Sequence, residues 1–220
     1  MDVLIHYEGK QVRFNDVSST DYIGRILLSG EWYEKSNLEF IRSLGAVGNY
    51  VDVGSYIGTH AIYFSMFCGA KHVYAFEPHA ENYNHLQHNL SINEVHNCSP
   101  FQCALMEENT EGSMAEDKLN MGHTILQPGT GTVVRTLDSF SFEDVKVLKI
   151  DVEGLEYRTL KGGQQTLKQV EHLFVEVWDE GQCRSYQCPY MFPQICQYLG
   201  QLGFQYRTTL TDSLRYFERS

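Results

Sequence analysis

The sequence predicts an α/β fold built on one mostly parallel, doubly wound sheet. Short runs rich in β-branched and aromatic residues alternate with segments whose apolar residues recur every three or four positions. That alternation is typical of parallel strands joined by helices. In addition, 42% of the 220 residues are hydrophobic, and the length suits a single well-buried globular unit.

An N-terminal extension precedes the predicted sheet. Its elements are a β-hairpin (residues 3–7 and 11–14), a helix in the run SSTDYIGRILLSG with Ser or Thr as its N-cap and Gly30 beyond its end, and a second helix (residues 35–44). We expect residues 1–48 to pack over the sheet as hairpin and helices. Residues 49–220 are then expected to form the main domain.

The main domain is predicted to alternate strands and helices and to close with an antiparallel strand pair. The predicted strands are 50–53, 72–77, 99–105, 145–150 and 172–178, the helices are 57–68, 81–92, 155–167 (broken by Gly162-Gly163) and 191–199, and the closing pair is 204–208 and 215–218. The polar connection 107–131 is expected to be an active-site loop or a small hairpin. Parallel sheets of this kind bind ligands at the carboxyl ends of their strands.

The run Val51-Asp52-Val53-Gly54-Ser55-Tyr56-Ile57-Gly58 joins a buried strand to a helix start through a glycine turn. Gly54 permits a tight turn and a close backbone approach. The run lacks the middle glycine of a dinucleotide fingerprint and the Gly-Lys-Ser/Thr of a phosphate loop. Asp52 can receive an amine, so a ligand with amino and carboxylate groups is favoured, and a turn without any ligand is the alternative.

Two further positions place acids at predicted strand ends. Glu77 follows the glycine turn by the interval at which doubly wound folds bind ribose hydroxyls, and the alternative role is an N-cap for the next helix. Asp151 and Glu153 end the most apolar strand, and Glu176 ends the following one. Three acids at one edge suit a cation, a metal or substrate hydroxyls, and helix capping is the alternative.

These motifs together resemble the FkbM family of S-adenosylmethionine-dependent methyltransferases. The resemblance rests on five segments in the family's order: DVGSYIG, FEPHAENYNHLQHNLSIN, RTLDSF, LKIDVEGLEYRTLKGG and LFVEVW. The family's turn commonly reads D-V-G-A-N-x-G, and Ser55 and Tyr56 stand here at the Ala-Asn positions. The resemblance implies a Rossmann-like class I methyltransferase fold with S-adenosylmethionine as methyl donor and S-adenosylhomocysteine as product.

The resemblance also implies roles for individual residues. Asp52 and the turn residues through Gly58 would hold the amino-acid end of the donor, Glu77 the ribose hydroxyls, and Ala104 would flank the adenine. Glu34 matches a family acid ahead of the glycine turn and is expected near the donor.

The acceptor implied by the family is a hydroxyl group on a sugar, polyol or natural product. Because the donor methyl is already activated, the enzyme mainly aligns the oxygen and excludes water, and a base for the departing proton helps. Asp151 is the first candidate, and Glu153, Glu176 and His123 are the others. The alternatives to a methyltransferase are a dinucleotide-dependent oxidoreductase and a non-catalytic binding module of the same fold.

Charge and cysteine content complete the expectations. The chain has 17 Lys and Arg against 28 Asp and Glu, a net charge of −11, which disfavours nucleic-acid and anionic membrane partners. No apolar run reaches the roughly 20 residues of a membrane span and the N-terminus lacks a signal-peptide pattern, so a cytoplasmic protein beginning at Met1 is predicted. Its six cysteines are expected to be free thiols. A divalent metal is compatible with the three acids but is not predicted.

Overall fold

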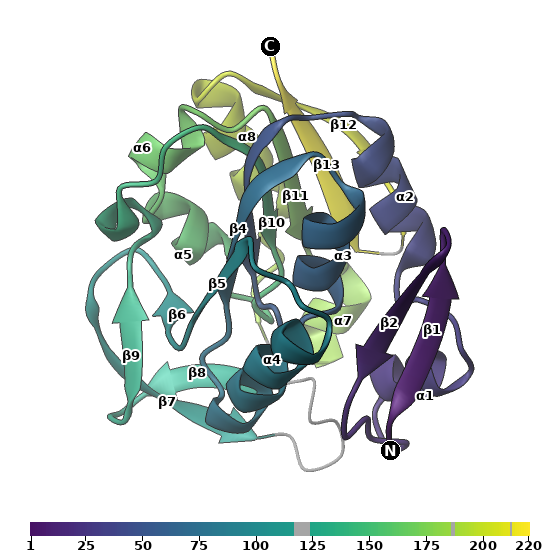
Figure 1. Ribbon diagram of the computed structural model, residues 1–220. Coiled ribbons are helices and arrows are strands. Elements are labelled where there is room, and N and C mark those ends of the chain that lie inside the picture. Colours follow the sequence, from purple (N-terminus) through teal and green to yellow (C-terminus); the bar gives the residue numbers. More distant parts are fainter. Residues whose placement is uncertain (117–123, 186–187, 212) are drawn as a thin grey trace.

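The computed structural model describes residues 1–116, 124–185, 188–211 and 213–220, and it confirms the predicted α/β fold (Figure 1). The main sheet has seven strands in the order β12-β13-β11-β10-β3-β4-β5. Its strands are β3 (Gly48–Val53), β4 (Ala70–Phe76), β5 (Cys98–Phe101), β10 (Val145–Ile150), β11 (His172–Glu176), β12 (Phe204–Thr209) and β13 (Leu214–Arg219). The first five pair in parallel, and β13 and β12 add the predicted antiparallel pair.

Side chains that alternate along the central strands form two apolar cores, one on each face of the sheet. Tyr50 and Val147 belong to one core, whereas their neighbours Val51 and Leu148 belong to the other. The first core is covered by α1 (Tyr22–Leu28), α2 (Lys35–Ser43), α3 (Thr59–Phe67) and α4 (Ala80–Ile92), and the second by α5 (Glu156–Lys161), α6 (Gln164–Leu167) and α8 (Phe192–Gln201). This two-sided burial explains why the central strands read as nearly continuous apolar runs.

The N-terminal extension contains the predicted hairpin, β1 (Val3–Tyr7) and β2 (Lys10–Phe14), followed by α1 and α2. Trp32, 2% exposed, joins this extension to the core, with its ring centroid 5.2 Å from that of Tyr63 on α3. The predicted N-cap of α1 is wrong in one detail. Asp21, not a Ser or Thr, caps the helix, because its Oδ1 accepts a 2.6 Å hydrogen bond from the Gly24 N–H.

A second sheet departs from the predicted topology. The single strand expected over residues 99–105 is two strands, β5 in the main sheet and β6 (Ala104–Leu105) in a separate four-stranded sheet of order β6-β9-β7-β8. The polar connection forms the hairpin β7 (Thr110–Glu116) and β8 (Thr124–Pro128), which was one of its two predicted forms, and then the unpredicted β9 (Thr132–Arg135). In Figure 1 this sheet lies below β5 and α5, at one end of the main sheet.

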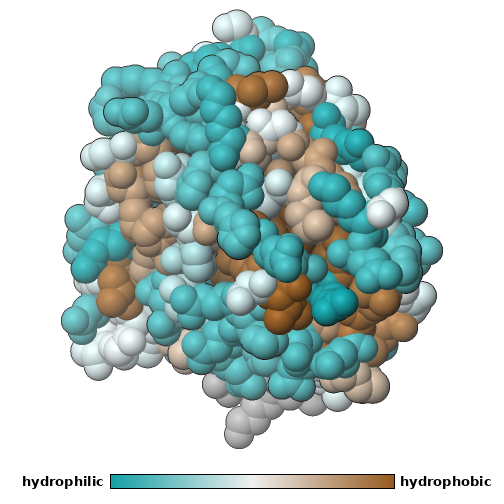
Figure 2. All heavy atoms as spheres, viewed as in Figure 1, coloured by the Kyte–Doolittle hydropathy of each residue, from teal (hydrophilic) through white to brown (hydrophobic). Residues whose placement is uncertain are grey.

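Two short elements complete the fold. A 3-10 turn, η1 (Leu137–Phe140), precedes β10, and the helix α7 (Glu180–Ser185) was not expected in its polar segment. All six cysteines are free thiols. Among the described helices none is both long and apolar enough to cross a bilayer, and polar side chains cover most of the face in Figure 2, with apolar residues in smaller groups between them.

Candidate active site

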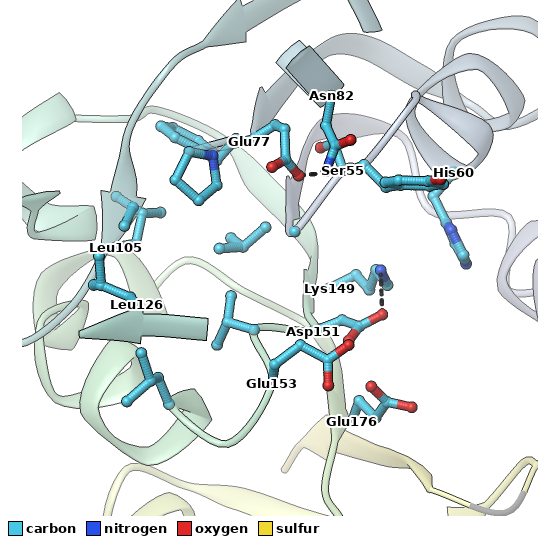
Figure 3. A pocket seen from close by; sticks show the side chains of 18 of the residues that line it. Ser55, His60, Glu77, Asn82, Leu105, Leu126, Lys149, Asp151, Glu153 and Glu176 are labelled. Atoms are coloured by element: carbon cyan, nitrogen blue, oxygen red, sulfur yellow. Dashed lines mark hydrogen bonds and ion pairs between the residues drawn. The ribbon is translucent and has the colours of Figure 1, made fainter. Parts of the chain in front are cut away.

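A cavity of about 350 Å³ opens at the carboxyl ends of β3, β4, β10 and β11 (Figure 3). This is the edge at which doubly wound sheets bind their ligands. Glu77 lies on one side of the cavity, and Asp151, Glu153 and Glu176 gather across from it, while Leu105 and Leu126 form an apolar side. The cavity therefore combines an apolar end with two separate acidic groups.

The glycine turn forms the wall between β3 and α3. Gly54 and Gly58 have φ of 82° and 94°, and Tyr56 has the unusual value of 49° for a residue with a side chain. The N–H groups of Gly54 and Ser55 both bond to the Phe76 carbonyl, at 3.0 and 2.9 Å. These two hydrogen bonds attach the turn to β4, so the two N–H groups are already engaged within the protein.

Gly54, Ser55 and Tyr56 line the cavity, whereas Gly58 does not lie on the described lining. Gly58 is the N-cap of α3 in the left-handed region. A Cβ there would lie 2.7 Å from the Leu86 Cδ1, so this glycine serves the packing of α3 against α4.

Glu77 lines the cavity and also bonds to the backbone at the start of α4, although the N-cap of that helix is His79 rather than Glu77. Its Oε1 accepts the His79 N–H at the start of α4, and its Oε2 accepts the Tyr56 N–H, both at 2.9 Å. The side chain nevertheless faces the cavity, and the residue is only 5% exposed. Burial raises the pKa of Glu77 to about 7, although the two N–H donors and Asn82 lower it.

Asp151, directly after β10, and Glu176, the last residue of β11, form a pair of neighbouring acids. Burial raises the pKa of Glu176 well above its usual range, and the neighbouring Asp151 carboxylate raises it further. Burial opposes ionisation of Asp151 too, but the Lys149 ammonium and a hydrogen bond from Glu176 together lower the pKa of Asp151 to about 2. The Ser213 hydroxyl donates to the Glu176 Oε1 at 2.6 Å. The arrangement favours an ionised Asp151 beside a protonated Glu176.

The turn after β10 carries Glu153 and is held by a buried glutamate. Glu153 and Gly154 both adopt positive φ, 54° and 94°. The Glu156 Oε1 accepts the N–H groups of Val152 at 3.2 Å and Gly154 at 3.0 Å, which fixes the backbone between Asp151 and α5. Glu156 therefore holds the turn that precedes α5, a helix whose N-cap is Leu155.

Lys149 is the site residue that the sequence motifs did not single out. It is 2% exposed, it lines the cavity, and its Nζ lies 3.1 Å from the Asp151 Oδ2 and 3.7 Å from the Asp52 Oδ1. The sequence did contain a signal for this residue. Lys149 stands among apolar residues in a strand of the sheet interior, a position that lysine rarely takes without an ionic partner.

Asp52 is not on the described cavity lining, which corrects its predicted contact with the amine of a ligand. It lies inside β3 with an exposure of 0%, and neither carboxylate oxygen has a hydrogen-bond partner. The physical reason is register, since Asp52 pairs with Lys149 in the sheet and the strand continues for one more residue before the turn. The side chain is a buried counter-charge to Lys149 behind the cavity.

The remaining predicted residues fall at three different places. Ala104 lines the cavity. Glu34 lies one layer behind the lining, where its Oε2 is 2.9 Å from the Nε2 of the lining residue His60 and its Oε1 accepts from the Asn37 amide. His123 lies outside the described residues.

The second sheet contributes an apolar rim that the sequence did not predict. Met114 on β7 and Leu126 on β8 are cross-strand partners and both line the cavity. Leu126 also packs on a small cluster that contains Ala104. The described residues contain no group of His, Cys, Asp and Glu with the arrangement of a metal site.

Comparison with solved structures identifies the fold as that of class I methyltransferases. A methyltransferase FkbM from Methylobacillus flagellatus aligns over 89% of this chain and 52% of its own, with a TM-score of 0.58 and 20% identity. A putative methyltransferase from Streptococcus mutans, solved in complex with SAH, aligns over 85% of this chain and 97% of its own, with a TM-score of 0.56 and 14% identity.

The family profile of the methyltransferase FkbM domain matches residues 52–206, and the chain belongs to this family of methyltransferases. The hexuronic acid methyltransferase AglP of Haloferax volcanii is 31% identical over 134 residues, which are 57% of this chain and 54% of AglP. The chain thus spans about half the length of this curated relative.

Proposed function

We propose that this domain transfers a methyl group from S-adenosylmethionine to a hydroxyl oxygen of a small sugar or polyol. The observation that carries the donor assignment is Glu77, a buried carboxyl group that faces a cavity between an apolar rim and an acidic floor. A carboxylate accepts two O–H bonds from a cis-diol, as a ribose requires.

The chemistry of the lining fits the three parts of the donor. Ala104, Met114 and Leu126 offer an apolar slot to a flat base. Glu77 faces the ribose, and the surface of the turn at Gly54 admits the amino-acid part. The ionised Asp151 opposite favours a ligand with positive charge, which suits a sulfonium and disfavours a pyrophosphate.

The bound donor supplies a methyl group that is already activated for transfer. The protein's task is then to align the acceptor oxygen, to exclude water and to receive a proton. Asp151 has a pKa too low to deprotonate an alcohol in advance. It is basic enough to take the proton from the strongly acidic protonated ether that transfer creates, so we assign it that late step. Glu153 and Glu176 border the same space and orient the acceptor.

Two observations support a sugar or polyol as the acceptor: the similarity to AglP and the negative net charge of the chain. AglP is described as a hexuronic acid methyltransferase, and its match covers more than half of this chain. A further neighbour in fold, from Streptococcus thermophilus, is described as an rRNA methylase. The net charge of −11 opposes binding to a phosphate backbone, and for that reason we favour the small acceptor.

Calorimetry with S-adenosylmethionine, S-adenosylhomocysteine and NAD tests the donor. We expect micromolar binding of both sulfur compounds and none of NAD, and the absence of heat with either sulfur compound would refute the proposal. A mass-spectrometric screen for a gain of one methylene on a panel of sugars, polyols and RNA fragments then tests the acceptor. Methylation of RNA in preference to the sugars would contradict the acceptor assignment and leave the donor assignment intact.

A further inference from the structure

Lys149 is buried at the floor of the cavity, where an ammonium without ionic partners would have a large desolvation cost. Its ammonium lies between Asp151 at 3.1 Å and Asp52 at 3.7 Å, and the exposures of the Lys149 and Asp52 side chains are 2% and 0%. Burial of a lysine ammonium carries a large desolvation cost, which the two neighbouring carboxylates offset here. The two aspartates also keep the ammonium protonated, since they raise the pKa of Lys149 against the effect of burial.

We propose that Lys149 is a positioning residue: held in place by Asp52, it keeps Asp151 ionised and fixed beside the reacting methyl group. Its charge then acts on the reaction only through Asp151. The consequence is a preference for the cationic donor over the neutral product, because an ionised Asp151 attracts the sulfonium and not the thioether. This inference rests on the proposed function for the identity of the donor.

Other charged and titratable groups also face Asp151 and must be separated from Lys149. They are Glu176 on β11, His60 on α3, Glu34 before α2, Glu153 in the following turn, Asp52 on β3 and the hydroxyl of Tyr33. Glu77 titrates in the same cavity, but it faces the ribose, which donor and product share. The ratio of the two dissociation constants, product over donor, therefore cancels the contribution of Glu77.

The direction in which the ratio changes distinguishes a positioning role of Lys149 from direct repulsion between its ammonium and the sulfonium. In Lys149→Met, loss of the ammonium removes a charge that lowers the pKa of Asp151, so the effect of burial raises that pKa. We expect the ratio of product to donor dissociation constants to fall by about tenfold near pH 6 and to recover as the pH rises. If Lys149 acted directly on the sulfonium by repulsion, its removal would raise the ratio instead, and that result would overturn the inference.

Three further variants complete the test. In an Asp151→Asn background, Lys149→Met should no longer lower the ratio, and an undiminished fall there would also overturn the proposal. Lys146→Met makes the same substitution on the same strand, where the ammonium contacts Glu171 and Asp144 outside the cavity lining, and we expect it to leave the ratio unchanged. Lys149→Arg, which keeps the charge, should retain most of the preference and provides a second variant if Lys149→Met folds poorly. If the wild-type protein binds neither sulfur compound, the proposed function fails as well.

Discussion

Gly54 lies directly against the backbone of Asp151, so that a Cβ at residue 54 would be 1.7 Å from the Asp151 carbonyl oxygen. This contact joins the glycine turn of β3 to the acidic end of β10. Strand ends that approach so closely hold the two halves of the cavity at a fixed separation.

Gly54→Ala should abolish binding of S-adenosylhomocysteine and lower the free energy of unfolding by about 3 kcal/mol or more, because the backbone of β10 must move. Gly30→Ala is the matched control. Gly30 also has a positive φ, 83°, but a Cβ there meets nothing within 4 Å, so only the roughly 1–2 kcal/mol of the left-handed conformation is expected. Calorimetry and urea unfolding measure both effects, and normal binding by Gly54→Ala would show that the contact is not needed.

Glu77 is expected to make donor binding depend on pH. The ribose hydroxyls require the ionised carboxylate, while burial raises the pKa of the free protein's Glu77 to about 7. Affinity for S-adenosylhomocysteine should therefore weaken as the pH falls below 7, and binding near pH 7 should release about half a proton. Titration in buffers of different ionisation enthalpy measures that release.

Glu77→Ala should remove detectable binding, because the diol loses its acceptor. Glu81→Gln is its control, since Glu81 is an exposed acid in the first turn of α4. Equal affinity of Glu77→Ala and the wild type would refute the assignment of Glu77 to the ribose.

Glu156 should destabilise the protein as the pH rises. Burial raises the pKa of Glu156 to about 7 from a usual value of 4.5, so the folded state retains a proton that the unfolded state has lost. The contribution is fully present below the unfolded pKa and is lost as the pH rises through 7. Glu156→Gln keeps an oxygen for the Val152 and Gly154 N–H groups and should flatten this part of the pH profile of unfolding by about 2–3 kcal/mol.

Glu156→Ala, by contrast, removes the acceptor and should cost about 2–3 kcal/mol below pH 7 as well. Glu143→Ala, at an exposed position, should cost little at any pH. An identical pH profile for Glu156→Gln and the wild type would contradict the buried titration.

Treatment with EDTA should leave methyl transfer unchanged. The Lys149 ammonium, 3.1 Å from Asp151, supplies at this acid the positive charge that a metal ion would otherwise bring. The measurement is transfer of labelled methyl before and after chelation, with added Mg²⁺ as control. Loss of activity on chelation and recovery with the metal would contradict the prediction.

The sequence was a good guide to the strands and to the residues that end them. The central strands are buried on both faces, and the turns that follow them carry Gly54, Glu77 and Asp151, so composition and motif agree there. Residues 99–105 were predicted less well. The polar Gln102 stands between apolar neighbours, as it could within one strand, and nothing local marks the point where the chain leaves one sheet at Phe101 and enters another at Ala104.

The site's charges were the hardest part to predict. Lys149 is one of two lysines in an otherwise apolar strand, and its contact with Asp52 can be seen only once the register places the two residues side by side on β10 and β3. The same register removes Asp52 from the cavity, although its position in the motif suggested a ligand contact. Both the contact of Lys149 with Asp52 and the position of Asp52 behind the cavity depend on the pairing of β3 with β10. The residue pattern of either segment alone does not reveal that pairing.

The second sheet shares no strand with the seven-stranded sheet, yet β7 and β8 bring Met114 and Leu126 to the cavity. The hairpin can therefore be replaced by another sequence. Such a replacement of residues 110–128 would reshape the apolar rim, while the strand ends that carry Glu77 and Asp151 keep their spacing. Redesign of the cavity's ligand preference can begin at that hairpin, which shares no strand with the main sheet.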